Sequence, residues 1–369
     1  MSMKVLVLGG YGNFGARICK ALAGNPGIAL VIGGRNGQRA SQLAFTLPSA
    51  SARAIDINAP DFSDVLARNQ IGLVIHTAGP FQEQGYTVAS ACARAGVHYI
   101  DLADGRRFVC DFPRDMHQSF FAAGKVAISG ASTVPALSSA VVNYLCEGWA
   151  LIESIDICIA PAQTAPRGLA TLRGVLDYCG KDIAVWRGGQ WDTAVGWAAP
   201  EKVYFQRLRP RIGAVCDIPD LEIFPAYFQV RDRVEFRAAV EVGITQRAFA
   251  VIAKLRKMGL VNKPAEWAGL LLRAAPLFDL LGSALGGMVV RVTGRDARGN
   301  TVRRSWHIAA DHDHGPEIPC MAAILLARQI ASGQPMPPGA VTCTGLLKLE
   351  QFAPEFSRWG MQTDVVDEA

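Results

Sequence analysis

The sequence lacks any C-x-x-C pair, and its nine cysteines are scattered along 369 residues. This spacing argues against a zinc site, and an odd cysteine count argues against a disulfide framework. Both observations favour a reducing compartment, so we expect a cytoplasmic protein. The chain opens Met-Ser-Met-Lys directly before a predicted strand, and we therefore expect no signal peptide.

Charge is also scarce, since only 19% of the residues are charged and 37 basic residues against 32 acidic ones leave a net charge of +5. A balance this mild does not require nucleic acid, and we expect none as a partner. The most apolar stretches, 126–146 and 268–290, contain polar residues and proline and make poor membrane spans. Half of the residues are hydrophobic, so the length suits two domains with sizeable cores.

Two catalytic signatures are missing as well. No tyrosine has a lysine four residues later, which argues against a short-chain dehydrogenase. No Gly-x-Ser-x-Gly elbow occurs, which argues against a nucleophilic hydrolase. The chemistry must therefore be sought in other patterns.

Residues 1–150 alternate short apolar runs with helical segments, which is typical of a parallel sheet with right-handed crossovers. The expected strands are 4–8, 28–32, 52–57, 73–76, 98–102 and 126–129. Here the sequence predicts an α/β fold, a Rossmann-type doubly wound parallel sheet.

Residues 151–345 have a different pattern. Apolar residues alternate with polar ones around 155–159 and 234–242, and a turn at 296–300 separates two further strands. This period of two predicts a second, α+β domain built on a mainly antiparallel sheet, used for substrate binding and dimerisation. Helices are expected at 245–258, 265–283 and 317–332, and the tail 346–369 is expected to pack back on the first domain.

A Gly-x-Gly-x-x-Gly turn lies between the first strand and the first helix. Its glycines permit a tight turn, a close approach of backbone to pyrophosphate, and close packing of helix on strand. The helix N-terminus then offers N–H groups to the phosphates. The residues expected to contact a dinucleotide here are Gly9, Gly10, Tyr11, Gly12, Asn13, Phe14 and Gly15.

The second strand ends in Gly33-Gly34-Arg35-Asn36, where NAD-binding folds usually carry an acidic residue for the ribose hydroxyl. A guanidinium instead pairs with a 2′-phosphate and stacks on adenine, and Asn36 adds a neutral donor. We therefore predict NADP as the cofactor, held partly by Arg35 and Asn36. A solvent-exposed arginine without a ligand is the alternative.

The segments Thr77 to Gly85, which includes Gly79-Pro80-Phe81, and Ala95 to Leu102 resemble the NADP-binding domain of the saccharopine dehydrogenase-like family. Gly130 to Ser138 resembles the strand-to-helix turn of that family. The resemblance implies an NADP(H)-dependent oxidoreductase that transfers a hydride to or from an imine or carbonyl of a small, amino-acid-like molecule. A non-catalytic NADP-binding sensor or scaffold stays open as the alternative.

Ligands of open parallel sheets bind beyond the carboxyl ends of the strands, where the strand order switches. Residues 77–81 follow one such strand, and we expect Ala78, Gly79, Pro80 and Phe81 to contact the cofactor, with Phe81 beside the nicotinamide. A stiff loop with Phe81 as a core residue is the alternative.

Tyr99 and Asp101 are two residues apart on the fifth strand and so point to the same face. We take both as candidate catalytic residues, because Asp101 could hold a substrate amine or relay a proton. A buried carboxylate that caps the next helix is the alternative.

Asp311-His312-Asp313-His314 offers alternating carboxylates and imidazoles, but hydride transfer to NADP needs no metal and no further His or Cys cluster completes a site. We predict a loop that leads into a helix, no metal, and His312 as a third catalytic candidate.

The helix predicted at 245–258 has Phe249, Ile252 and Leu255 on one side and basic residues elsewhere, a pattern compatible with a bilayer surface. Packing on the sheet or at a dimer interface is more common. The sequence thus favours a homodimer over membrane association.

Overall fold

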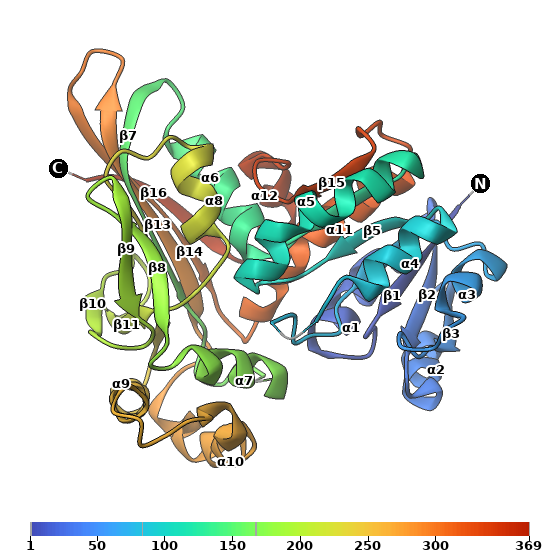
Figure 1. Ribbon diagram of the computed structural model, residues 1–369, viewed down its shortest axis with the longest axis horizontal. Coiled ribbons are helices and arrows are strands. Elements are labelled where there is room, and N and C mark those ends of the chain that lie inside the picture. Colours follow the sequence, from blue (N-terminus) through green and yellow to red (C-terminus); the bar gives the residue numbers. More distant parts are fainter. Residues whose placement is uncertain (1, 83, 167, 369) are drawn as a thin grey trace. The chain divides into compact units, whose positions relative to one another are not determined.

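The computed structural model describes residues 2–82, 84–166 and 168–368, which divide into two compact units (Figure 1). Unit 1 comprises Met1–Leu137 and Glu317–Leu347, and unit 2 comprises Ser138–Pro316 and Lys348–Ala369. Glu83, which belongs to the turn motif at 77–85, lies outside the described residues.

Unit 1 is built on a seven-stranded parallel sheet with the strand order β15-β6-β5-β4-β1-β2-β3. Its strands are β1 (Met3–Leu8), β2 (Ile28–Gly34), β3 (Ala50–Ala54), β4 (Leu73–His76), β5 (His98–Asp101), β6 (Val126–Ser129) and β15 (Gly339–Thr342). Its helices are α1 (Asn13–Leu22), α2 (Gly37–Phe45), α3 (Phe62–Arg68), α4 (Thr87–Ala95), α5 (Arg106–Ala122), the π-helical turn η1 (Thr133–Leu137) and α11 (Ile318–Ala331).

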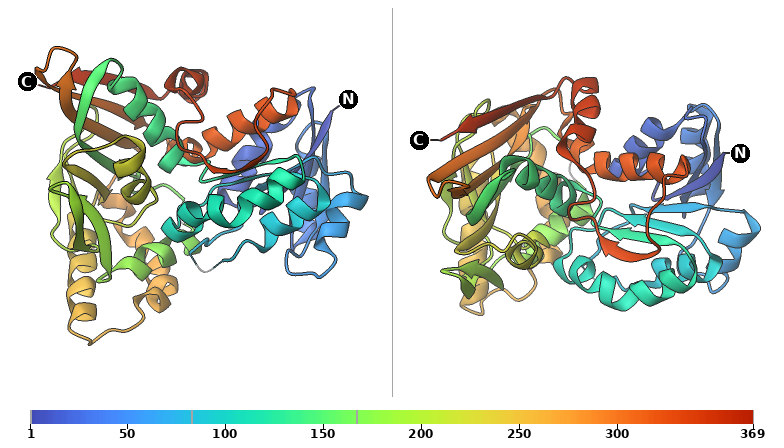
Figure 2. Two further views of the ribbon diagram at one scale, coloured as in Figure 1. Left: turned by 45° about the horizontal axis from the view of Figure 1, so that its top comes forward. Right: turned by 90° about the horizontal axis from the view of Figure 1, so that it is seen from above.

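Both faces of this sheet are covered by helices, which is why its central strands β1 and β4 are largely apolar and buried. Residues 5–8 of β1 and all four residues of β4 are buried. Helix α1 packs against α11 on one face, and α4 packs against α3 and α5 on the other (Figure 2). The predicted doubly wound fold is confirmed.

The strand order reverses direction beside β1, which pairs with β2 on one side and with β4 on the other. The loops that follow β1 and β4 therefore emerge next to each other at the carboxyl edge of the sheet. This is the switch point at which open α/β sheets bind their ligands.

The domain boundaries differ from the predicted 1–150, 151–345 and 346–369. Strand β15 pairs in parallel with β6, and α11 packs on α1, so Glu317–Leu347 belongs to the first unit. Unit 2 begins already at Ser138. The physical reason is that the edge of the first sheet, β6, takes up a strand from far along the chain.

Unit 2 is built on a nine-stranded sheet with the main order β10-β11-β12-β7-β13-β14-β16, and β8 pairs with β12 and β9. The strands are β7 (Trp149–Ala160), β8 (Asp182–Arg187), β9 (Gln190–Val195), β10 (Glu201–Val203), β11 (Arg211–Val215), β12 (Arg233–Val240), β13 (Gly286–Asp296), β14 (Thr301–Ala310) and β16 (Gln362–Asp367). The helical segments are α6 (Ser138–Leu145), α7 (Leu169–Tyr178), α8 (Asp220–Tyr227), α9 (Gly243–Lys257), η2 (Pro264–Trp267), α10 (Ala268–Ala274), η3 (Ala275–Leu281), η4 (Gly315–Glu317, whose last residue belongs to unit 1) and α12 (Leu349–Arg358).

Most pairings in this second sheet are antiparallel, as predicted, and β13 and β14 form the expected hairpin around 296–300. The exception is β12, which runs parallel to β7. The tail also departs from the prediction, because β16 pairs with β14 and so completes the second sheet. In the described part of the chain, no helix is both long and apolar enough to cross a membrane.

Candidate cofactor site and polar clusters

The glycine-rich turn after β1 has the backbone that a pyrophosphate site requires. Gly9 has φ +76°, a conformation that side chains rarely adopt, and a Cβ there would lie 2.8 Å from Thr77 Oγ1. A Cβ at Gly15 would collide with the Gly9 carbonyl oxygen, so this glycine lets α1 pack directly on the turn. No side chain of the described residues caps α1 at Gly12, which leaves the first N–H groups of the helix available.

Tyr11, in the middle of this turn, reaches across to the end of β2. Its hydroxyl oxygen accepts a hydrogen bond from the Asn36 backbone N–H at 3.0 Å, and its ring lies against Gly34, where a Cβ would be 2.5 Å away. The Arg39 guanidinium lies 4.9 Å from the centre of the same ring, a cation–π contact. Tyr11 thus connects the phosphate turn with the loop predicted to bind the adenosine end.

Three arginines surround this loop. Arg35 follows β2 directly, Arg39 lies in the first turn of α2, and Arg53 pairs in register with Gly33 on the neighbouring strand β3. All three side chains are exposed. The Asn36 side-chain oxygen accepts the Arg39 backbone N–H at 3.0 Å, so Asn36 caps α2 and leaves only its amide N–H groups as donors. The cluster presents positive charge at the end of β2, where the sequence predicts contact with a 2′-phosphate.

The loop after β4 lies beside the glycine turn. The Thr77 hydroxyl donates to the Leu8 carbonyl at 2.7 Å, and Gln84 Nε2 donates to the carbonyls of Ala78 and Pro80 at 2.8 Å each. The Gly79–Pro80 peptide bond is cis. The side chain of Phe81 is buried against His76 and Phe108, as the core alternative requires, while Ala78 to Pro80 retain exposed surface.

A buried polar chain extends along the carboxyl ends of β4, β5 and β6. The His76 Nδ1 atom lies 3.1 Å from the Tyr99 hydroxyl. The Asp101 Oδ1 atom accepts hydrogen bonds from the Ser129 hydroxyl at 3.0 Å and from the backbone N–H groups of Gly130 and Ala103 at 2.8 and 2.9 Å. His76, Tyr99 and Asp101 are each no more than 1% exposed.

Burial sets the protonation of these groups. It raises the pKa of Asp101 to about 6, although the three donors to its carboxylate oppose the shift, and it lowers the pKa of His76 to about 4. Burial, and then the nearby charge of Asp101, raises the pKa of Tyr99. Among the described residues, neither His76 Nε2 nor Asp101 Oδ2 has a hydrogen-bond partner. The carboxyl group therefore titrates close to neutral pH beneath the loops of the switch point.

Two of the three predicted catalytic residues, Tyr99 and Asp101, lie in unit 1, whereas His312 lies in unit 2. Tyr99 and Asp101 come together in unit 1, but both are covered, and Asp101 fastens the turn after β6 to the end of β5. Their catalytic role stays a prediction, and the geometry favours positioning over direct contact. Sequence reasoning missed His76 and Ser129; the signal was that each is the last residue of a predicted strand, and His76 ends the strand that borders the switch point.

His312 lies in unit 2, in a loop with unusual backbone. Both His312 and Asp313 have positive φ values, +54° and +57°. The Asp313 carboxylate accepts a hydrogen bond from the Thr164 hydroxyl at 2.6 Å, and His314 Nδ1 lies 3.0 Å from the Trp359 carbonyl oxygen. His312 itself is exposed. In the described residues, no group of three or more His, Cys, Asp or Glu side chains is arranged to hold a metal ion.

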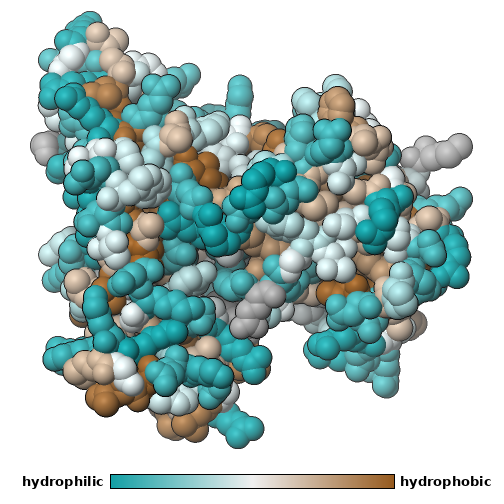
Figure 3. Space-filling model, viewed as in Figure 1, coloured by the Kyte–Doolittle hydropathy of each residue, from teal (hydrophilic) through white to brown (hydrophobic). Residues whose placement is uncertain are grey.

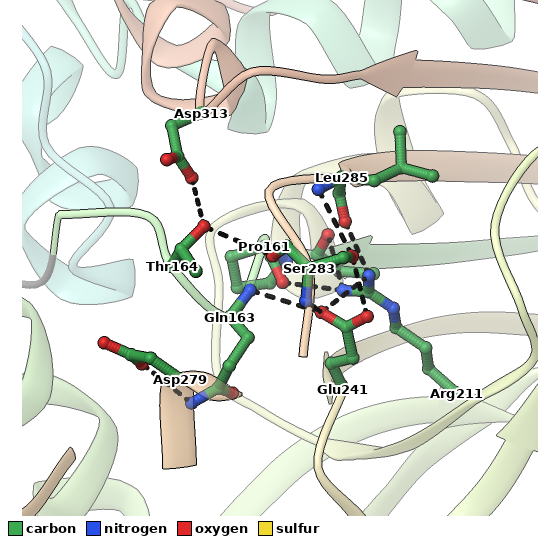
Figure 4. Close-up of polar contacts among 10 residues, drawn as sticks. Pro161, Gln163, Thr164, Arg211, Glu241, Asp279, Ser283, Leu285 and Asp313 are labelled. Carbon is green, nitrogen blue, oxygen red and sulfur yellow. Dashed lines mark hydrogen bonds and ion pairs between the residues drawn. The ribbon is translucent and has the colours of Figure 1, made fainter. Parts of the chain in front are cut away.

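An ion pair between the buried Arg211 and the partly exposed Glu241 supports this loop (Figure 4). Arg211, 3% exposed, lies 3.3 Å from the Glu241 carboxylate and donates to the carbonyls of Pro161 and Leu285. Glu241 in turn accepts the Ser283 hydroxyl and backbone N–H at 2.8 and 3.0 Å. The strand ends of unit 2 are thereby bound to the segments that carry Thr164 and Asp313.

Comparisons with known proteins agree with this geometry. Residues 5–128 match the family model of the saccharopine dehydrogenase NADP binding domain. The fold is similar to that of saccharopine dehydrogenase (L-Glu forming) from Saccharomyces cerevisiae, with 13% identity, a TM-score of 0.73 and full coverage of both chains. It is also similar to homospermidine synthase from Legionella pneumophila in complex with NAD, with 10% identity, a TM-score of 0.66 and coverage of 100% of this chain and 92% of the other.

The parallel sheet, the glycine turn and the loops at its switch point define a dinucleotide-binding protein of the Rossmann class. Within that class, residues 5–128, which lie in unit 1, match the NADP binding domain of saccharopine dehydrogenase.

Proposed function

We propose that the protein is an NADP(H)-dependent oxidoreductase that transfers a hydride to or from an imine or carbonyl carbon of a small, amino-acid-like substrate. The observation that carries the proposal is the uncapped glycine turn at the switch point, next to the loop 77–81 and within reach of the arginine cluster at the end of β2. The scattered cysteines favour a cytoplasmic enzyme.

The residues present fit this cofactor. The backbone of Gly9 to Gly12 and the first N–H groups of α1 would bind the pyrophosphate. Arg35 would pair with the 2′-phosphate, while Arg39, held over the Tyr11 ring, adds a second positive charge. An acidic residue, which would repel the phosphate, is absent from 33–36.

The nicotinamide supplies or accepts the hydride when it is bound, so the chain itself must bind, orient and exclude water. The loop 77–81 is held rigid by Gln84 and would form one wall beside the nicotinamide. Asp101 holds the turn that begins at Gly130, and its carboxyl group, with a pKa raised to about 6, is suited to exchange a proton near neutral pH. The catalytic role of His312, which lies exposed in unit 2, stays a prediction.

The experiment is a screen of NADPH oxidation with pools of 2-oxo acids, aldehydes and amines, each alone and in pairs. The proposal expects turnover with a carbonyl compound, or with a carbonyl compound and an amine together, and slower turnover with NADH. Tight NADPH binding without turnover in any pool would instead support the sensor or scaffold alternative.

A further inference from the structure

Segment 243–281 of unit 2, which contains α9, η2, α10 and η3, leaves many large apolar side chains in contact with solvent. Among the described residues, nine of the nineteen exposed large hydrophobic side chains lie in this segment. They are Ile244, Val251, Met258, Leu260, Trp267, Leu270, Leu277, Leu280 and Leu281. Leu280 is 95% exposed and Leu277 is 76% exposed. A concentration of this kind marks an interaction surface.

Helix α9 shows that the exposure follows a pattern. Its inner face packs as a normal amphipathic helix does, with Ile252 buried and Phe249 against Trp197 at 4.7 Å between ring centres. Ile244, Val251 and Met258 are spaced seven residues apart and therefore form a second stripe, on the outer face. The sequence prediction recognised only the inner stripe. A helix with apolar residues on both faces has one face without a partner within its own unit.

The segment also has an excess of positive charge. It carries six basic side chains against two acidic ones, Glu266 and Asp279, a net charge of +4. Arg247 and Lys254 are exposed, and each lies three residues after a member of the outer stripe, on its flank. Figure 3 shows apolar surface bordered by hydrophilic side chains over α9 and α10 at the lower left.

The segment is also anchored rather than loose. In η3, the Asp279 carboxylate accepts a hydrogen bond from Gln163 Nε2 at 3.3 Å, and the Gln163 backbone N–H donates to Glu241 at the same distance (Figure 4). Because Glu241 pairs with the buried Arg211, the leucines of η3 are held on the frame of the second sheet. Their exposure is therefore a property of the fold.

We propose that segment 243–281 docks unit 2 on an anionic membrane surface, with the exposed leucines and Trp267 at the level of the headgroups and the basic side chains on the phosphates. Apolar area and positive charge are the two terms that determine binding at such interfaces. A second copy of this chain fits less well, because a symmetric contact would bring two patches of net positive charge together. This inference goes beyond the proposed function and does not depend on it.

The test is co-sedimentation of the full chain with vesicles of phosphatidylcholine alone and of phosphatidylcholine mixed with phosphatidylserine. No cofactor is added, so the result is independent of oxidoreductase activity. We expect binding to the anionic vesicles that weakens with added salt, and little binding to the neutral ones. An unmodified protein that stays in the supernatant with both would overturn the proposal.

Matched variants separate the contribution of the apolar side chains to vesicle binding from that of the positive charge. Leu277→Ser with Leu280→Ser and Leu281→Ser should lower affinity for the anionic vesicles about tenfold or more, and Arg247→Glu with Lys254→Glu should do the same. The controls are Phe45→Ser, an exposed aromatic residue of unit 1, and Lys20→Glu with Arg94→Glu, exposed charges of unit 1; neither should change binding. Equal loss in the controls would contradict the assignment of this surface.

Circular dichroism melting of every variant establishes that it is folded. Sedimentation velocity of the unmodified protein tests the alternative that a second copy of this chain covers segment 243–281. A concentration-dependent dimer that the leucine variant abolishes, with no vesicle binding by the unmodified protein, would replace the membrane by a second chain and overturn the proposal.

Discussion

The Tyr11 hydroxyl oxygen accepts a hydrogen bond from the Asn36 backbone N–H across 3.0 Å, and so links the phosphate turn to the loop that carries Arg35. Asn36 also caps α2, so the same residue fixes the start of the helix on which Arg39 lies. The arginines at the end of β2 are therefore held in a defined position relative to the glycine turn before any ligand binds. Such preorganisation lowers the cost of binding a dinucleotide.

Cofactor preference should depend on Arg35. A charge-assisted contact to a phosphate contributes roughly 1.5–3 kcal/mol, which corresponds to about tenfold to a hundredfold in affinity. Arg35→Asp should weaken NADPH binding by that factor and leave NADH binding equal or better, as measured by fluorescence titration of both cofactors. Arg94→Asp, an exposed arginine on α4, is the control and should change neither. Equal affinity of the unmodified protein for both cofactors would contradict the prediction.

Asp101→Asn tests the buried carboxyl group. Asparagine keeps the oxygen that accepts from Ser129, Gly130 and Ala103, and it removes the titration with a pKa of about 6. If Asp101 handles a proton, turnover should fall about tenfold or more, the usual scale for such a group, and the pH profile of kcat should lose a step near that pKa. NADPH affinity should stay within about twofold, because the phosphates are bound elsewhere.

A structural role for Asp101 would give a different result. The variant would then melt at a lower temperature but keep its turnover and its pH profile. Ser129→Ala serves as the comparison, since it removes one donor and leaves the carboxylate in place.

Chelation should have no effect. The carboxylate of Asp313 is engaged by Thr164, and His314 is bonded to a backbone carbonyl, so the loop 311–314 is organised without an ion. Incubation with EDTA should change neither the melting temperature nor NADPH affinity. A melting temperature that falls on chelation and recovers with zinc would show that the prediction is wrong.

The features that the sequence predicted correctly are those that depend on local residue patterns. The alternation of strands and helices over 1–137 and the glycine turn follow from apolar periodicity and from backbone geometry, and both could be read without a structure. The return of β15 to β6 could not, because 339–342 gives no local sign of its distant partner. The parallel pairing of β12 with β7 was hidden for the same reason: a period of two shows a strand but not its neighbours.

The site was predicted to a similar extent. Arg35 and the glycines are visible in a motif, whereas the contact of Tyr11 with Asn36 and the approach of His76 to Tyr99 depend on which strands are adjacent. The apolar stripe of Ile244, Val251 and Met258 was missed because the inner stripe of the same helix already explained its periodicity.

Gln246 should be replaceable by a residue without polar atoms. It is fully buried on α9, and among the described residues neither Oε1 nor Nε2 has a hydrogen-bond partner. Gln246→Met keeps the unbranched shape and removes the unsatisfied groups, so the free energy of unfolding should rise by about 1 kcal/mol or more. Ile252→Ala on the same helix is the comparison and should lower it by about 2–4 kcal/mol. A clear loss with Gln246→Met would reveal a bound partner of the amide.

Asp220 gives unit 2 a pH-dependent stability. It is the first residue of α8, fully buried, and its Oδ1 accepts a hydrogen bond from the Ser138 hydroxyl. Burial raises its pKa from 3.8 to about 7, with the Ser138 bond opposing the shift. A folded-state pKa above the unfolded one means that the folded chain binds the proton more tightly. The stabilising contribution is therefore complete below about pH 4 and is lost as the pH rises through about 7.

Asp220→Asn removes this dependence. Relative to the unmodified protein, the free energy of unfolding of the variant should rise by about 2–4 kcal/mol between about pH 4 and pH 7. The comparison must be a difference between the two proteins, because His76, whose pKa burial lowers to about 4, acts in the opposite direction in both. All seven tryptophans lie in unit 2, so tryptophan fluorescence in urea follows the unit that carries Asp220. A difference that stays constant across this range would show that the carboxyl group is ionised throughout, and hence that water or another donor reaches its second oxygen.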